Sequence, residues 1–154
     1  ALDGTRPVIS NDGWEHTLSD FLTLHDYEED GDAFYARYYD MDRIVSNGIH
    51  MTNSKYAFAE GHEYDGQPII LSEYGGIAFT TEGDQWGYGR SVGTMEDFEA
   101  RLGKLHDAIR ECGYFKGVCY TQLTDVQQEV NGLLEMDHTI KIPAGIMRRL
   151  MERL

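Results

Sequence analysis

The chain has 154 residues, 41% of them hydrophobic, which is enough for one domain with its own core, and we treat residues 1–154 as a single domain. Its 27 acidic and 13 basic residues give a net charge of −14, which disfavours nucleic acid and anionic membranes as partners, because phosphate contacts need clustered Lys and Arg. No apolar run is long enough to cross a bilayer. The charge does not exclude neutral ligands, and carbohydrates are the largest class of these.

The amino terminus, ALDGTRPV, lacks both a methionine and the features of a signal peptide. We therefore expect the chain to be a piece of a longer protein. The cellular compartment stays undetermined.

Four short apolar runs predict buried β-strands, at residues 6–10, 21–25, 68–73 and 115–123. Each run is almost continuously apolar rather than alternating, which favours a parallel sheet covered by helices.

Three segments between and after these runs predict helices, at residues 32–47, 94–113 and 143–154. The second is the clearest, since Thr94 is a typical N-cap and Gly113 a typical end. Pro143 suits the first position of the third helix. The resulting order predicts an α/β fold, either an open sheet or part of a (β/α)₈ barrel. A complete barrel needs about 250 residues, so the chain has the length of half a barrel, four parallel strands with their helices.

Polar residues follow each predicted strand, where the carboxyl ends of parallel strands meet and form the binding face of such folds. These residues are Asn11, Asp12, Trp14, His25, Asp26, Tyr27, Glu73, Tyr74, Tyr120, Gln122 and Asp125.

Glu73 is the strongest catalytic candidate among them, although a glutamate before two glycines is also a common turn residue. The apolar run before it places the carboxylate at the rim of a core, and Gly75 and Gly76 allow a substrate close to the backbone. Tyr27, at the matching level of another strand, is placed to donate a hydrogen bond to the ionised carboxylate and keep it nucleophilic.

The stretch PIILSEYGG, preceded by RPVISNDGW and FLTLHDYE and followed by FKGVCYTQLTD and NGLLEMDHTIK, resembles the catalytic barrel of glycoside hydrolase family 2. The resemblance covers nearly the whole chain from Thr5 onward, and implies that the four strands are barrel strands five to eight. It makes Glu73 the nucleophile, within Ser72-Glu73-Tyr74-Gly75, and Tyr27 the tyrosine that orients it. Asn11, Asp12, Trp14, His25, Asp26, Tyr120 and Asp125 would then line a carbohydrate pocket, and no organic cofactor is implied.

The sequence departs from the family pattern in three places. Tyr120 stands where the family usually has a tryptophan beneath the sugar. Asn131 has no lysine beside it, unlike the family's glucuronidases, so a β-galactosidase-like activity is favoured over a glucuronidase. The chain also has no Asn-Glu pair, so we expect the acid/base glutamate to lie upstream of Ala1 and the isolated chain to be inactive.

Two other classes remain open. One is a non-catalytic carbohydrate-binding or scaffold module of the same fold, and the other is a free-standing doubly wound domain that binds a small ligand. The exposed edge strands of a half barrel also predict a homo-oligomer.

Several further patterns favour a structural interpretation. Residues 26–32, DYEEDGD, resemble the start of a calcium loop, but Arg37 stands where such a loop needs a glutamate, and the histidines lack metal-site spacing, so we expect no metal. Cys112 and Cys119 are expected to be free thiols rather than a disulfide, and His106 a loop or surface residue. Trp86 and Tyr88, in a glycine-rich loop, either stack on sugar rings or pin that loop to the barrel.

Overall fold

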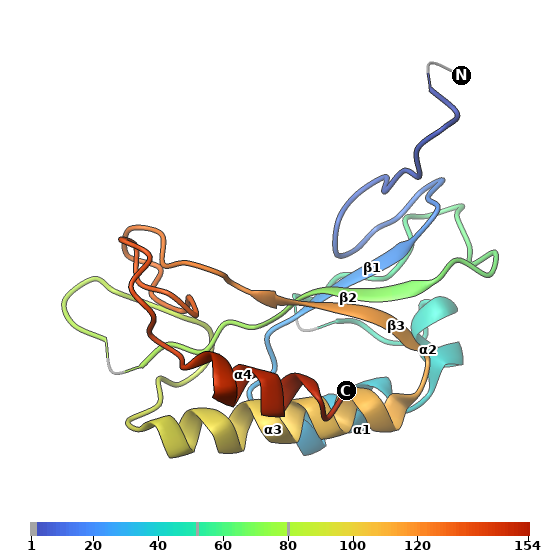
Figure 1. Cartoon of the computed structure of the whole chain (residues 1–154). Helices are drawn as coiled ribbons and strands as arrows, with labels where there is room; N and C mark the ends of the chain where they lie inside the picture. Colours follow the sequence, from blue (N-terminus) through green and yellow to red (C-terminus); the bar gives the residue numbers. More distant parts are fainter. Residues whose placement is uncertain (1–2, 52, 80) are drawn as a thin grey trace.

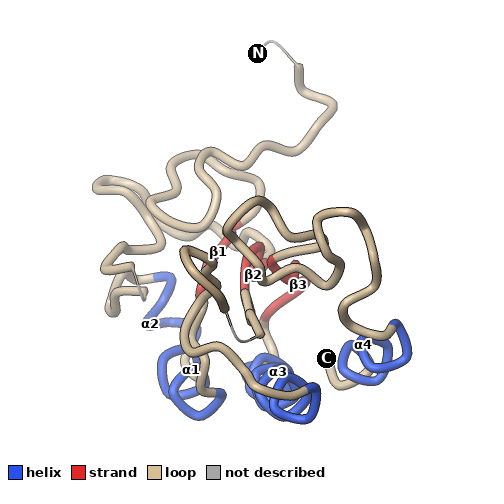
Figure 2. Tube along the Cα trace, turned by 90° about the vertical axis from the view of Figure 1, so that its left-hand side faces the viewer, coloured by secondary structure: helices blue, strands red, loops and turns tan. Residues whose placement is uncertain are grey.

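The computed structural model describes residues 3–51, 53–79 and 81–154, and within them three strands form one parallel sheet. The strands are β1 (Leu22–Asp26), β2 (Ile69–Gly75) and β3 (Phe115–Thr121), in the spatial order β1-β2-β3. Figures 1 and 2 show α1, α3 and α4 along one face of this sheet. Parallel strands with helices on one face make up a segment of a barrel, so the predicted α/β partial barrel is confirmed.

The predicted strand at residues 6–10 is wrong, and the sheet has three strands rather than four among the described residues. Val8 and Ile9 are 53% and 44% exposed. The amide of Val8 donates to the Asp20 carboxylate, and its carbonyl accepts from the Asp20 amide. A strand needs the backbone groups of a neighbouring strand, and here a turn supplies the partners instead.

The predicted helix at residues 32–47 is divided into α1 (Gly31–Tyr38) and α2 (Met41–Val45). Asp40 has an extended backbone, and its carboxylate accepts a hydrogen bond from the amide of Asp42. An aspartate that caps a new helix in this way ends the previous one. The sequence indicated a helix in this region but not the break between Tyr38 and Met41.

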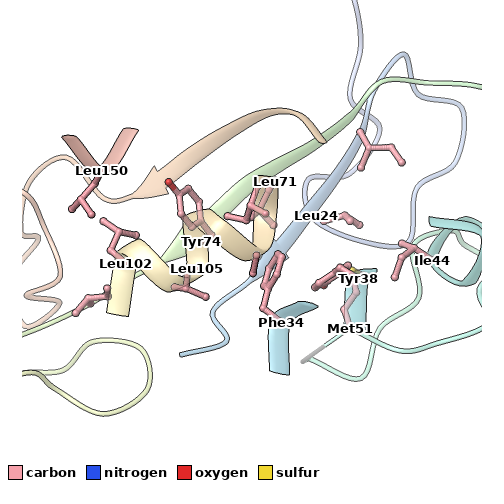
Figure 3. Close-up of a cluster of buried hydrophobic side chains, with 14 of the residues drawn as sticks. Leu24, Phe34, Tyr38, Ile44, Met51, Leu71, Tyr74, Leu102, Leu105 and Leu150 are labelled. Carbon is pink, nitrogen blue, oxygen red and sulfur yellow. The ribbon is translucent and has the colours of Figure 1, made fainter. Parts of the chain in front are cut away.

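Helix α3 (Met95–Cys112) confirms the prediction for residues 94–113. Thr94 accepts a hydrogen bond from the Asp97 amide, and Gly113 takes the left-handed conformation (φ 74°) that ends the helix. Its apolar face packs beneath β2, where Leu102 and Leu105 meet Leu71 and Tyr74 in the core drawn in Figure 3. Helix α4 (Ala144–Met151) also matches its prediction, with Pro143 as the N-cap rather than the first helical residue.

His106 is fully buried, so its prediction as a loop or surface residue is wrong. Its Nδ1–H donates to the carbonyl of Leu150 (2.7 Å), and Nε2 therefore accepts a hydrogen bond from the Tyr74 hydroxyl (2.7 Å). The imidazole ties α3 to α4 and to the residue that follows Glu73. It thereby helps to fix the carboxyl end of β2.

Two smaller expectations can be compared with the described residues. Cys112 and Cys119 are free thiols, as predicted. No helix in the described ranges has the length and apolarity that a membrane span requires.

His106 gives the fold a testable pH dependence. Burial lowers the pKa of His106, so the folded state resists protonation, whereas the unfolded chain takes up this proton as the pH falls below about 6.5. The free energy of unfolding should therefore decrease as the pH falls through this range. Urea unfolding at pH 7.5 and 5.5 should show a smaller decrease in His106→Gln than in the original protein. His138→Asn, at an exposed site, should keep the original pH dependence, and equal decreases in all three proteins would contradict the assignment.

Candidate active site

Glu73 lies near the carboxyl end of β2, where the strand is irregular. Leu71 and Tyr74 are both buried on the helix side, and two residues rather than one separate them. The register of β2 shifts at this point against both neighbouring strands. Such a bulge lets two consecutive side chains, Ser72 and Glu73, reach the face of the sheet away from the helices.

Tyr27 immediately follows β1, the neighbouring strand, and its hydroxyl donates a hydrogen bond to the Glu73 carboxylate at 2.5 Å. Burial, together with this hydrogen bond, raises the pKa of Tyr27 well above its usual value, so the phenol stays protonated and remains a donor. The structure therefore brings together the two residues that the sequence singled out. Tyr27 therefore acts as a hydrogen-bond donor to the Glu73 carboxylate and not as a competing acceptor.

His25 connects Glu73 to a second carboxylate. Its Nδ1 lies 3.2 Å from Glu73 Oε2, and its Nε2 lies 3.2 Å from Asp12 Oδ2. Ser72 donates a hydrogen bond to the other Asp12 oxygen at 2.7 Å. Although burial opposes it, the hydrogen bond from Ser72 and the adjacent His25 lower the pKa of Asp12, so this carboxylate is ionised at neutral pH.

Asp12, His25 and Glu73 offer ligand atoms within 4.8 Å of one another, which raises the question of a cation. Each carboxylate, however, faces a different nitrogen of the same ring. The expected absence of a metal stays a prediction.

The loop before β1 packs against His25. The amide of Gly13 donates to the hydroxyl of Thr23, and a Cβ at Gly13 would overlap the His25 ring. Trp14 meets the same ring edge-on, with 5.1 Å between centroids. Asn11 uses its amide within this loop, where it donates to the Trp14 carbonyl. The four predicted residues Asn11, Asp12, Trp14 and His25 therefore form one assembly.

Asp26 does not belong to this assembly, and its predicted role in substrate binding has no support from its contacts. Its side chain is fully buried on the opposite face of β1, bonded to Arg37 (2.9 Å) and to the Tyr38 hydroxyl (2.7 Å) of α1. Burial raises the pKa of Asp26 even though Arg37 opposes the shift. Side chains alternate along a strand, so His25 and Asp26 face opposite ways.

The predicted role of Tyr120 in substrate binding likewise has no support from its contacts. Its ring meets Tyr74 edge-on and contacts Phe98 of α3, so it packs on the helix side of β3. Its hydroxyl accepts a hydrogen bond from the Ile77 amide. The next residue, Thr121, pairs with Gly75 and approaches the Tyr27 hydroxyl, and sequence reasoning missed it. Alternation along β3 was the signal that would have found it.

Asp125 follows β3 in a loop, and the structure gives its carboxylate structural partners. It accepts hydrogen bonds from Lys141 (2.6 Å) and from the Gly132 amide (2.7 Å), and its side chain is 5% exposed. These contacts join three positions of the segment that follows β3. A role for Asp125 in substrate binding stays a prediction without support from its contacts.

A hollow of about 810 Å³ lies elsewhere, next to Asp20 and Gln67, which precede β1 and β2. It is therefore at the amino ends of the strands, whereas Glu73 is at the carboxyl end of β2. Parallel α/β folds bind their ligands at the carboxyl ends of the strands, so we place the site at Glu73 and not at this hollow.

No family model and no curated protein sequence matches the chain. Solved structures do resemble it. They include a β-glucuronidase from Faecalibacterium prausnitzii (TM-score 0.53, 15% identity, 87% of this chain and 22% of that one). A β-glucuronidase from Bifidobacterium dentium complexed with coumarin-3-O-glucuronide gives a TM-score of 0.52 at 16% identity over 86% of this chain and 21% of that one. A β-glucuronidase from Ruminococcus gnavus in complex with D-glucaro 1,5-lactone gives a TM-score of 0.51 at 13% identity, over 88% of this chain and 23% of that one.

The chain thus spans about a fifth of the length of these enzymes and shares the fold of that part. This agrees with the partial barrel that the resemblance to glycoside hydrolase family 2 implied. At such low identity the likeness shows the fold alone.

The ion pair between Asp26 and Arg37 joins β1 to α1 on the helix side of the sheet. Its contribution to stability can be tested by substitution. Arg37→Met leaves the buried carboxylate with Tyr38 and a backbone amide only, and should lower the free energy of unfolding by about 3 kcal/mol. Asp26→Asn in the same chain should recover part of this loss, because it removes the uncompensated charge. Arg43→Met, which loses only a contact with the Tyr39 ring, should cost about 1 kcal/mol or less in the same urea titration. Equal losses for the two arginines would contradict the buried-charge explanation.

Proposed function

We propose that the chain forms the nucleophile-bearing part of a retaining β-glycosidase similar to glycoside hydrolase family 2. The observation that carries the proposal is the 2.5 Å hydrogen bond from Tyr27 to Glu73 at the carboxyl ends of adjacent parallel strands. The fold shared with part of several β-glucuronidases supports it. The sequence resemblance around Ser72-Glu73-Tyr74-Gly75 supports the same assignment.

In the proposed reaction, the ionised Glu73 attacks the anomeric carbon of a β-glycoside. The bond between that carbon and the leaving oxygen breaks, while a second carboxylic acid donates its proton to this oxygen. Water then attacks the glycosyl-enzyme, with the second carboxylate as its base, and frees Glu73. Tyr27 donates to Glu73 throughout and holds the attacking oxygen in place.

Asp12 is the nearest candidate for the second carboxylic acid within the chain. A pair of carboxylates about 5 Å apart suits a retaining enzyme, and Asp12 and Glu73 have oxygen atoms within 4.8 Å. An acid catalyst needs a raised pKa, however, and the pKa of Asp12 is lowered. We therefore assign Asp12, with His25, Asn11 and Trp14, to substrate binding. The acid/base glutamate is proposed to come from a part of the protein that precedes this chain.

A neutral sugar fits the described residues better than a uronic acid. A uronate carboxylate needs a cation with no other partner, as Arg or Lys provides. Lys141 lies 3.2 Å from the Val130 carbonyl, next to Asn131, but it is already paired with Asp125. The proposed substrates are therefore neutral β-glycosides such as β-galactosides, unlike those that the names of the structural neighbours indicate.

The nucleophile assignment can be tested by covalent trapping in the complete protein that contains this chain. A 2,4-dinitrophenyl 2-deoxy-2-fluoro-β-galactoside should label the peptide with Glu73, as seen by intact mass and peptide mapping. Glu73→Gln should abolish labelling and reduce aryl β-galactosidase activity by on the order of 10³-fold or more. Glu82→Gln, an exposed carboxylate in the following loop, should leave both unchanged.

Three results would count against the proposal. A sugar adduct on another residue would move the nucleophile elsewhere. Full activity of Glu73→Gln would remove Glu73 from the reaction. A sugar bound without any turnover or adduct would favour the non-catalytic carbohydrate-binding module.

The predicted homo-oligomer has a structural basis in β3, which pairs with β2 on one side and is half exposed along its length in the described chain. An open strand edge can pair with a second copy. The chain of residues 1–154 should show a mass above 17.5 kDa by light scattering at micromolar concentrations. Val118→Lys or Val118→Pro should shift this mass toward that of a monomer, because a charge or a proline on an edge strand opposes pairing with another chain. A monomeric mass at all concentrations would contradict the prediction.

A further inference from the structure

Tyr27 lies face to face with a second tyrosine that the proposed mechanism does not use. The rings of Tyr27 and Tyr88 are 3.4 Å apart at their centroids and within 5° of parallel. Tyr88 belongs to the glycine-rich loop of residues 82–93, between β2 and α3. The face of Tyr27 is thus covered, while its hydroxyl points to Glu73.

The backbone brings Tyr88 onto Tyr27 through two glycines. The amide of Tyr88 donates to the carbonyl of Gly76 at 2.9 Å. A Cβ at Gly76 would overlap the Tyr88 ring and lie 3.0 Å from the Tyr27 ring, and the φ of 58° at Gly76 also favours glycine. Gly87 in turn leaves room for Ala78. The close approach of the two rings therefore depends on Gly76, three residues after Glu73, and on Gly87 in the loop itself.

Charged side chains tie the same loop to the segment that carries Tyr27. Glu29, two residues after Tyr27, accepts hydrogen bonds from the amide (2.7 Å) and the Nε (2.9 Å) of Arg90. Arg101 of α3 lies 3.7 Å from Glu29 and donates to the carbonyls of Tyr88 (3.1 Å) and Arg90 (2.6 Å). The Arg101 side chain is only 10% exposed, so these contacts are little weakened by solvent.

The other end of the loop is held by the loop after β3, and the two lie side by side at the left of Figure 1. The Trp86 amide donates to the Gln128 carbonyl, and the Val130 amide donates to the Trp86 carbonyl. Trp86 also meets the Tyr88 ring edge-on at 5.5 Å. Tyr88 is therefore fixed from both sides.

We infer that Tyr88 is a positioning residue, which holds the Tyr27 ring at the angle where its hydroxyl reaches Glu73. The inference rests on the proposed function of Glu73 and deepens it. A phenol ring without this neighbour can turn toward solvent, and each turn breaks the bond to Glu73. The six-membered ring of Tyr88 provides the contact, and its hydroxyl is not required.

The kinetic test measures the rate at which the fluorinated β-galactoside labels Glu73 in the complete protein. A hydrogen bond to a charged group contributes a factor of about 10 to 100, so Tyr27→Phe should slow the limiting rate by this amount. Tyr88→Leu should slow it by about 10-fold with an unchanged half-saturating concentration, whereas Tyr88→Phe, which keeps the ring, should stay within about twofold. In the Tyr27→Phe background, Tyr88→Leu should cause no further loss.

The outcomes separate this inference from the proposed function. Absence of labelling at Glu73 in the original protein would overturn the proposed function. Labelling that Tyr88→Leu leaves unchanged, or that it slows equally in the Tyr27→Phe background, would overturn only the role of Tyr88.

A spectroscopic measurement tests the same role without turnover. The Tyr27 hydroxyl proton, protected by a short hydrogen bond to a carboxylate, should give a low-field proton resonance that is absent in Tyr27→Phe. This resonance should persist in Tyr88→Phe and be lost in Tyr88→Leu and in Arg101→Met, which releases the loop from α3. Persistence of the resonance in both of the latter variants would overturn the inference.

Discussion

The hydrogen bond from Tyr27 to Glu73 joins two neighbouring parallel strands, and the surrounding structure depends on the register between them. Tyr27 is fixed at its level because β1 is anchored in the core by Leu22 and Leu24, and Glu73 because Leu71 and Tyr74 are buried on either side of it. Each of these fully buried side chains stabilises the fold by about 1.5–3 kcal/mol relative to an exposed one. Core packing therefore sets the relative position of the Tyr27 hydroxyl and the Glu73 carboxylate.

The carboxyl end of the sheet carries several negative charges, and the structure distributes them over its two faces, where they have different partners. Asp26 is turned toward α1, where Arg37 and Tyr38 compensate its burial. Asp12 and Glu73 stay on the other face, each 3.2 Å from a nitrogen of His25, with side chains 51% and 38% exposed, respectively. Among the described residues, no Lys or Arg side chain is paired with either carboxylate. In the proposed glycosidase reaction, these carboxylates would stabilise the positive charge that develops on the sugar.

The sequence predicted the central part of this arrangement. A run of aliphatic residues that ends on a glutamate and two glycines indicated a buried strand with a carboxylate at its end, and the continuous apolar runs indicated parallel pairing. Strong end signals likewise placed α3, since Thr94 and Gly113 act locally on the helix that they flank. These features depend on short stretches of chain.

The errors arose where orientation or a distant partner decides the outcome. His25 and Asp26 are adjacent in one strand, as are Tyr120 and Thr121, and only one of each pair can face the site. Residues 6–10 have the composition of a strand, but their backbone pairs with the turn at Asp20. The stack of Tyr88 on Tyr27 joins residues 61 positions apart, and no local pattern predicts it.

We propose that Glu73 attacks the sugar while the Tyr27 hydroxyl holds the Glu73 carboxylate in place. A crystal structure of the complete protein, trapped with a 2-fluoro β-galactoside, tests this most directly. We expect continuous electron density between a Glu73 carboxylate oxygen and the anomeric carbon. The Tyr27 hydroxyl should still lie within hydrogen-bond distance of that carboxylate. Density that joins the sugar to a different residue, or an intact glycoside bound away from Glu73, would contradict it.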